Sequence, residues 1–132
     1  MLSSTSTAAP ARLLVVEDNL DTADLLEMIL EDRFTVAVAH SFDEAATLLD
    51  GRPFDLFVFD IHLGGERTGV ELLRDARALP NYHDVPAIAC TAYATGTGRR
   101  DEHDLSVFDL TVRKPFETET LLGAVAQMLT AR

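Results

Sequence analysis

Short, almost continuous apolar runs alternate along the chain with longer segments in which apolar residues recur every three or four positions. The runs are typical of β-strands that are covered on both faces, and the recurring pattern is typical of amphipathic helices. Strands are expected at 13–16, 34–38, 54–59, 85–91 and 110–113. Strands that alternate with helices of this length predict an α/β fold, with a doubly wound five-stranded parallel sheet and helices on both faces.

The amphipathic segments define the expected helices, which lie near 19–30, 41–49, 69–79 and 117–129. Leu25 is among the apolar residues expected on the buried face of the first helix. Ser41 and Glu44 have the spacing of a capping box at the start of the second helix. The segment between the fourth and fifth strands is the weakest helix candidate, because Gly96 and Gly98 each cost ~1 kcal/mol relative to alanine in a helix interior.

Composition and charge narrow the class of protein. With 132 residues that are 47% hydrophobic, the chain is expected to form a flexible tail at 1–11 and one globular domain at 12–132, with no effector domain. A formal net charge of −11 argues against nucleic-acid partners, which are bound through lysine and arginine. No run approaches the ~20 apolar residues that span a bilayer, so no membrane partner is expected. The Ser/Thr/Ala-rich start does not resemble a secretory signal, and a cytoplasmic location is expected.

Polar residues stand where four of the apolar strands end. They are Glu17 and Asp18 after the first strand, Asp60 after the third, Thr91 at the end of the fourth and Lys114 after the fifth. In an open parallel sheet, ligands bind beyond the carboxyl ends of the strands, so these side chains are expected at one edge. Carboxylates, a hydroxyl and an ammonium group in one place suit a divalent cation and a phosphoryl group.

The chemistry of these groups is that of phosphoryl transfer. Magnesium takes oxygen ligands, which Glu17, Asp18 and Asp60 can supply. Asp60 follows a strand of aromatic and branched residues, so we expect a rigidly held carboxylate that can attack phosphorus when a metal orients the phosphate. Thr91 and Lys114 are complementary to the oxygens of the resulting acyl phosphate. Taken singly, the acidic pair also fits a solvated turn and Lys114 a surface charge, but four matching strand ends favour a site.

The same residues carry a resemblance to a known family. The chain resembles the receiver domain of two-component response regulators, of the single-domain type, over nearly its whole length from residue 12. The matching segments are LLVVEDN at 13–19, FDLFVFDIHL at 54–63, and the short segments at 69–72, 91–92 and 114–116. The resemblance implies a flavodoxin-like receiver fold with strand order 2-1-3-4-5.

The resemblance further implies a bacterial phosphoprotein that takes part in signal transduction. Asp60 would accept a phosphoryl group from a histidine kinase or a histidine phosphotransfer protein, with Mg²⁺ as the cofactor and Mn²⁺ as a substitute. Asp18 would be the principal metal ligand, Glu17 would act mostly through water, and the backbone carbonyl of His62 would also bind the metal. Such a domain catalyses only its own phosphorylation and dephosphorylation, so we do not expect an enzyme in the usual sense.

The resemblance also implies a switch, in which Thr91 moves toward the phosphoryl group and alters the fourth helix and fifth strand. The Lys114–Pro115 peptide bond would be cis. The family usually has an aromatic residue three positions before the lysine, where this chain has Thr111, which is too small and polar for that part. The loop after the third strand is one residue longer than the commonest form and has Gly64 where proline is usual. The standard relay is therefore not expected to operate unchanged.

Two further residues are candidate modulators of the acyl phosphate. His62 and Tyr93 lie two residues after Asp60 and Thr91, where side chains of this family flank the attacking water. We hypothesise that both shield the acyl phosphate and lengthen its lifetime. The alternative is that both point away and only cover the rim of the site.

The sequence leaves some alternative functions and assemblies open and disfavours others. The chain could be a phosphate shuttle or sink, or the excised receiver of a hybrid histidine kinase. An aspartate-dependent phosphatase would need a cap domain and further acidic ligands late in the sequence. A flavin- or nucleotide-binding domain would need a phosphate cradle where this chain has the acidic Glu17 and Asp18. Homodimerisation through the fourth-helix face or the last helix is compatible with the sequence.

Overall fold

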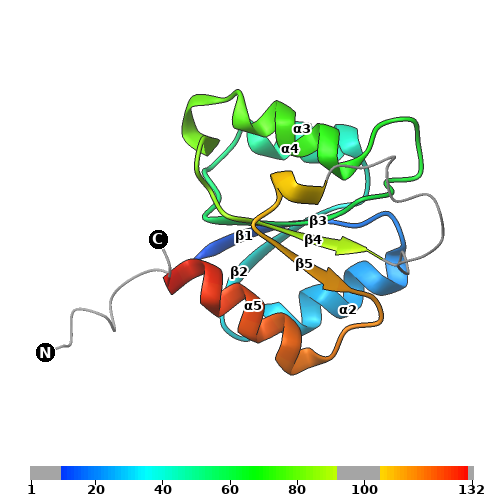
Figure 1. Ribbon diagram of the computed structural model, residues 1–132, viewed down its shortest axis with the longest axis vertical. Helices are drawn as coiled ribbons and strands as arrows, with labels where there is room; N and C mark the ends of the chain where they lie inside the picture. The colour runs from blue at the N-terminus through cyan, green and yellow to red at the C-terminus, as the bar shows by residue number, and fades with distance from the viewer. Residues whose placement is uncertain (1–9, 92–104, 131–132) are drawn as a thin grey trace, which may run out of the picture.

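Five parallel strands form one sheet in the order β2-β1-β3-β4-β5 in the computed structural model, which describes residues 10–91 and 105–130 (Figure 1). The strands are β1 (Arg12–Val16), β2 (Thr35–Ala39), β3 (Leu56–Asp60), β4 (Ala87–Thr91) and β5 (Leu110–Arg113). The helices are α2 (Leu20–Leu30), α3 (Phe42–Leu49), α4 (Gly69–Arg77) and α5 (Thr118–Thr130), with the 3-10 turns η1 (Pro80–Tyr82) and η3 (Leu105–Val107). None of these helices is long and apolar enough to cross a membrane. The expected fold class and strand order are confirmed.

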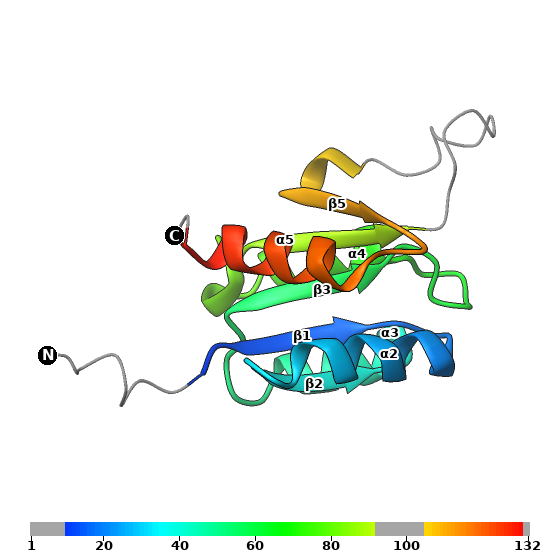
Figure 2. The same cartoon turned by 90° about the horizontal axis from the view of Figure 1, so that it is seen from below.

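Helices cover both faces of the sheet. α3 and α4 lie on one face, and α2 and α5 lie on the other (Figures 1 and 2). Because successive side chains of a strand point to opposite faces, Leu14 of β1 packs in the first layer and Leu13 and Val15 pack in the second. These three side chains are fully buried, as expected for a strand in the middle of a parallel sheet.

Side-chain caps begin α2, α3 and α4 at the carboxyl edge of the sheet. At α4 a full capping box forms, because Thr68 Oγ1 accepts the Glu71 N–H and Glu71 Oε1 accepts the Thr68 N–H. The capping box expected at Ser41 and Glu44 forms only in part. Ser41 Oγ accepts the Glu44 N–H at 3.1 Å, but Glu44 Oε1 accepts the N–H of His40 at 2.7 Å. The same carboxylate lies 3.6 Å from His40 Nδ1, so His40 and not Ser41 offers it two contacts.

Helix α2 presents apolar side chains to solvent. Leu26 and Leu30 are buried against the sheet, whereas Leu25, which was expected to face inward, is 46% exposed. Leu25 lies about 100° around the helix from Leu26, so only one of the two can point at the core. Leu20 and Met28 are 61% and 64% exposed. The expectation for Leu25 was therefore wrong, and α2 exposes three large apolar side chains beside the acidic Asp21 and Asp24.

The weak helix candidate after β4 falls mainly on residues 92–104, which lie outside the described residues. The described residues that follow pack onto the layer of α3 and α4. Phe108 is buried, and its ring meets that of Phe59 edge-on at a centroid distance of 6.4 Å. This contact attaches the start of β5 to the core beneath the carboxyl edge.

Candidate functional site

The register of the strands brings the expected site residues to one edge of the sheet. The paired positions near this edge are Val16 with Phe59, Asp60 with Cys90, and Thr91 with Arg113. Glu17 and Lys114 each follow the last residue of a strand. The Lys114 N–H donates to the Thr91 carbonyl at 2.9 Å, which joins the ends of β4 and β5. The Lys114–Pro115 peptide bond is cis.

Three carboxylates converge at this edge. Glu17, Asp18 and Asp60 each offer an oxygen, and these oxygens all lie within 4.8 Å of one another. Glu17 is 1% exposed and Asp60 is 6% exposed, while Asp18 is exposed to solvent. Buried carboxylates this close repel one another unless a cation balances them. Such a set of hard oxygen donors with one open side fits Mg²⁺, which keeps several of its waters when bound.

Lys114 supplies the positive charge within the cluster. Its Nζ lies 2.6 Å from Glu17 Oε1 and 3.4 Å from Asp60 Oδ2. The other oxygen of Glu17, Oε2, accepts the N–H of Asn19 at 3.1 Å. Both oxygens of Glu17 therefore have donors from the chain itself, and Lys114 bridges Glu17 to Asp60.

The buried environment shifts the protonation equilibria of this site. Burial raises the pKa of Asp60, the adjacent Glu17 carboxylate raises it further, and Lys114 opposes both, with a net pKa of about 7. For Lys114, burial lowers the pKa, but the hydrogen bond to Glu17 and the attraction of Asp60 and Glu17 outweigh burial and raise it overall. Without a divalent cation, Asp60 thus holds a proton more tightly in the folded chain than in the unfolded chain.

This proton affinity gives a test on stability. Because the pKa of Asp60 is raised from 3.8 to about 7 by folding, ionised Asp60 destabilises the fold increasingly as pH rises through that window. We expect Asp60→Asn to raise the free energy of unfolding by about 1–2 kcal/mol at pH ~7 without divalent cations, a value discounted for the coupling to Lys114. The gain should shrink toward zero as pH falls to ~4. Urea unfolding at a series of pH values in EDTA measures it, and a gain independent of pH would contradict this account.

The loop between β3 and α4 closes directly over the site. The Gly69 N–H donates to the Ile61 carbonyl at 2.8 Å, and His62 and Thr68 form an isolated antiparallel bridge. A Cβ on Gly69 would lie 2.1 Å from the backbone oxygen of Asp60, so no other residue fits there without displacement. Gly64 has φ +82°, and a Cβ there would lie 3.0 Å from Asp18 Oδ2. The glycines therefore let the loop pass close to the Asp18 carboxylate and to the backbone of Asp60.

The remaining expected site residues differ in burial, and one of them lies outside the described residues. Thr91 is buried at the end of β4, and the side chain of His62 is exposed on the loop after β3. Tyr93 lies outside the described residues, so its suggested shielding of the site is a prediction. Thr111, at the usual aromatic position, is exposed on β5.

The supporting roles of two residues, Asn19 and Gly69, were not identified from the sequence. The Asn19 N–H holds Glu17, and Gly69 allows the close approach of α4 to Asp60. A glycine at the first position of an amphipathic helix was the available signal for the role of Gly69. Nothing in the residue pattern marked the backbone N–H of Asn19.

Comparison with known proteins agrees with this geometry. The family model of the response regulator receiver domain matches residues 13–126. A protein of Leptolyngbya boryana, described as an uncharacterized 14.6 kDa protein, is 38% identical over 122 residues, which are 92% of each chain. The transcriptional regulatory protein CpxR of Escherichia coli K12 is 30% identical over 119 residues, which are 89% of this chain and 49% of CpxR. The chain thus spans about half the length of CpxR.

Solved structures share the fold. A CheY-like response regulator receiver domain protein from Methanospirillum hungatei JF-1 has a TM-score of 0.81 and 27% identity, over 93% of this chain and 96% of that one. The receiver domain of the sensor histidine kinase PA1611 from Pseudomonas aeruginosa PAO1 has a TM-score of 0.82 and 27% identity, over 92% and 99%. In that structure a magnesium ion is coordinated in the active-site cleft.

Proposed function

The chain belongs to the response regulator receiver domain family, and we propose that it serves as the phosphoacceptor of a two-component phosphorelay. The observation that carries this proposal is the buried Asp60 carboxylate, which lies among Glu17 and Asp18 and 3.4 Å from the ammonium group of Lys114. Glu17, Asp18, Asp60 and the His62 carbonyl would hold Mg²⁺. When bound, Mg²⁺ neutralises the carboxylates and the phosphoryl oxygens, so that the anionic nucleophile and the anionic phosphate can approach each other.

The reaction follows from the placement of the chain's own groups. A lone pair on the Asp60 carboxylate forms a P–O bond while the P–N bond to the donor's histidine breaks, and the electron pair stays on the imidazole nitrogen. Lys114 would turn from Glu17 to a phosphoryl oxygen, and the Thr91 hydroxyl would donate to another. Because burial already removes Asp60 from most of the solvent, few waters need to be displaced before attack.

The phosphodonor would dock beside Asp60 on the outer surface of α2. Leu20, Leu25 and Met28 give this surface three exposed apolar side chains. A cavity of about 300 Å³ next to it is lined by Thr22, Leu25, Lys114, Pro115 and Phe116. A histidine kinase or a histidine phosphotransfer protein that presents a helix here would bring its phosphohistidine to the carboxyl edge of the sheet.

The proposed function extends to what phosphorylation changes. Occupation of Asp60 would shift the conformation near Thr91 and so alter partner binding, without an enzymatic activity on another substrate. The alternatives are a phosphate shuttle or sink and the receiver of a hybrid histidine kinase. A cytoplasmic bacterial location, a homodimer and the shielding role of His62 and Tyr93 stay predictions.

A small acyl-phosphate donor tests the proposal without a cognate kinase. With Mg²⁺ or Mn²⁺, intact mass spectrometry should show a single phosphate adduct on the wild type and none in EDTA. Asp60→Asn should give no adduct, whereas Asp32→Asn, the same change in the exposed turn after α2, should be labelled normally. The absence of any adduct on a folded protein that binds Mg²⁺ would contradict the proposal.

A further inference from the structure

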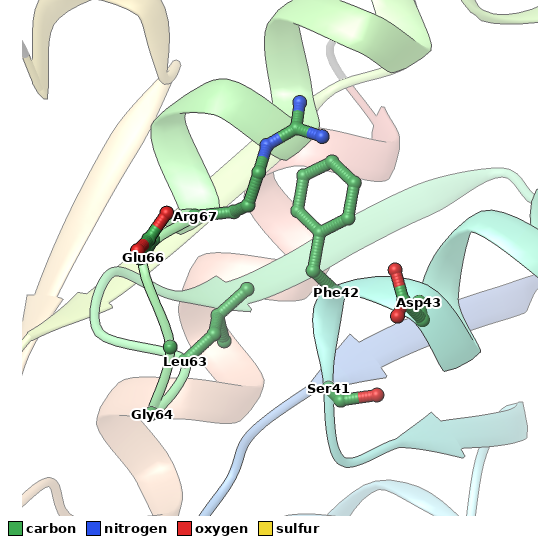
Figure 3. Close-up of a pocket in the computed structure, with 8 residues that line it drawn as sticks. Ser41, Phe42, Asp43, Leu63, Gly64, Glu66 and Arg67 are labelled. Atoms are coloured by element: carbon green, nitrogen blue, oxygen red, sulfur yellow. The ribbon is translucent and has the colours of Figure 1, made fainter.

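Arg67, at the end of the loop between β3 and α4, contacts two helices at once. Its guanidinium carbon lies 3.9 Å from the centroid of the Phe42 ring, at the first residue of α3 (Figure 3). On its other side, Nη2 lies 3.0 Å from Asp75 Oδ2, and Nε lies 3.9 Å from Glu71 Oε1 of α4. The returning arm of the loop is thereby attached both to α3 and to α4.

The loop that Arg67 attaches is the one that passes over the carboxylates. At its base, the Gly69 N–H donates to the Ile61 carbonyl, and the bridge between His62 and Thr68 aligns the two arms. At its tip, the left-handed Gly64 approaches Asp18 Oδ2. The position of the tip, and with it the space for a cation at Asp18, depends on what holds the arms in place.

Packing beneath the tip is incomplete. A cavity of about 350 Å³ separates the tip from the start of α3, and its lining is formed by Ser41, Phe42, Asp43, Leu63 and residues 64–67 (Figure 3). Leu63 is the buried apolar side chain of this lining, at 6% exposure. Leu63 belongs to the hydrophobic core, and the stacking of Arg67 on Phe42 is a further contact that joins the returning arm of the loop to the start of α3.

We propose that Arg67 is a positioning residue that, by stacking on Phe42, holds the β3–α4 loop in its metal-binding position. This inference rests on the proposed Mg²⁺ site. Arg67 and its acidic partners are about half exposed, so each contact alone is weak. Together they favour a closed state of the loop over an open one. The apparent affinity for Mg²⁺ decreases as the closed fraction of the protein decreases. Loss of the stacking should therefore weaken Mg²⁺ binding by about three- to tenfold.

The sign of this effect separates it from simple electrostatics. Removing a positive charge near a carboxylate cluster would by itself strengthen cation binding. Arg67→Gln should nevertheless weaken Mg²⁺ binding, because the loop is released. Phe42→Leu, which changes no charge and keeps an apolar side chain at this half-buried position, should weaken it to a similar extent. Phe42→Tyr, which keeps the ring, should bind Mg²⁺ like the wild type.

The test combines two measurements on folded protein. Calorimetric titration gives the Mg²⁺ dissociation constant, and amide hydrogen exchange without metal gives the opening of the loop through the protected N–H of Gly69. We expect both Arg67→Gln and Phe42→Leu to weaken Mg²⁺ binding and to speed this exchange. In the double variant, the change in binding free energy should be smaller than the sum of the two single changes. Arg52→Gln, the same change in the exposed turn after α3, should alter neither.

The possible outcomes distinguish the positioning role of Arg67 from the proposed Mg²⁺ site itself. Wild-type dissociation constants in both variants, or tighter binding in Arg67→Gln and unchanged binding in Phe42→Leu, would overturn the positioning role and leave the metal site intact. A wild type that binds no Mg²⁺ would overturn the proposed metal site and this inference together. A lower melting temperature with unchanged affinity and exchange would show that Arg67 is merely structural, which also overturns the inference.

Discussion

Gly69→Ala is expected to destabilise the protein by about 3 kcal/mol or more and to abolish phosphoryl labelling of the folded fraction. The added Cβ would lie 2.1 Å from the Asp60 oxygen and 3.3 Å from the Ile61 Cα. Both neighbours are backbone atoms at the buried end of β3, which is paired with strands on both sides. Neither atom can shift without a cost to the strand pairing, so the substitution must displace either α4 or Asp60.

A second glycine provides the matched control for this substitution. Gly123 lies in α5, and a Cβ there would meet nothing within 4 Å. Gly123→Ala should stabilise the protein by about 0.5–1 kcal/mol, because alanine is favoured over glycine in a helix interior. Urea unfolding gives both free energies. Equal stability of the Gly69→Ala variant and the wild type would show that the close approach to Asp60 is not a constraint.

Lys114→Met should have the second largest effect, on both stability and labelling. Its removal takes the ammonium partner from Glu17, which is 1% exposed and still accepts the Asn19 N–H, and Asp60 must then either hold a proton or stay as a like charge. We expect a loss of about 2–4 kcal/mol near neutral pH in EDTA. Labelling by an acyl phosphate should slow by about tenfold to a hundredfold, because a positive charge aimed at the transferred phosphoryl group is lost.

The pH and metal dependence identify the cause of this loss. Because folding raises the pKa of Lys114, its contribution is complete below its ordinary pKa and disappears only as pH rises beyond that value. The penalty of Lys114→Met should shrink as pH falls below the Asp60 pKa of about 7, where Asp60 is neutral in the fold, and also in Mg²⁺. Arg113→Met, the same charge change at the neighbouring exposed position, should stay within about 0.5 kcal/mol of the wild type. A penalty that is unaffected by both pH and Mg²⁺ would contradict the ion-pair explanation.

Much of the fold and the composition of the site follow from the sequence by simple rules. The apolar runs before Glu17 and Asp60 are long enough to identify central strands, and parallel strands bring their carboxyl ends to one edge. The prediction of Asp60, Thr91 and Lys114 as candidate site residues needs no more than this. Their arrangement at that edge is the part that periodicity and topology determine.

What the sequence left open depends on distances between elements. The bridge of Lys114 to Glu17, the close approach of Gly69 and the stacking of Arg67 on Phe42 each join residues whose separation is fixed only by packing. Leu25 was misplaced for a related reason. The spacing of the apolar residues around Leu26 is compatible with Leu25 on either the buried or the outer face of the helix. The exposure of Leu25 therefore depends on the rotation of α2 about its axis.

Chemical trapping of the acyl phosphate tests the central claim most directly. Protein labelled in Mg²⁺ would be reduced with borohydride, which converts an aspartyl phosphate to homoserine, and then mapped by peptide mass spectrometry. We expect homoserine at position 60 and at no other acidic residue. Homoserine at Asp18, or a phosphate that survives reduction on a histidine such as His62, would contradict the assignment of Asp60 as the phosphoacceptor.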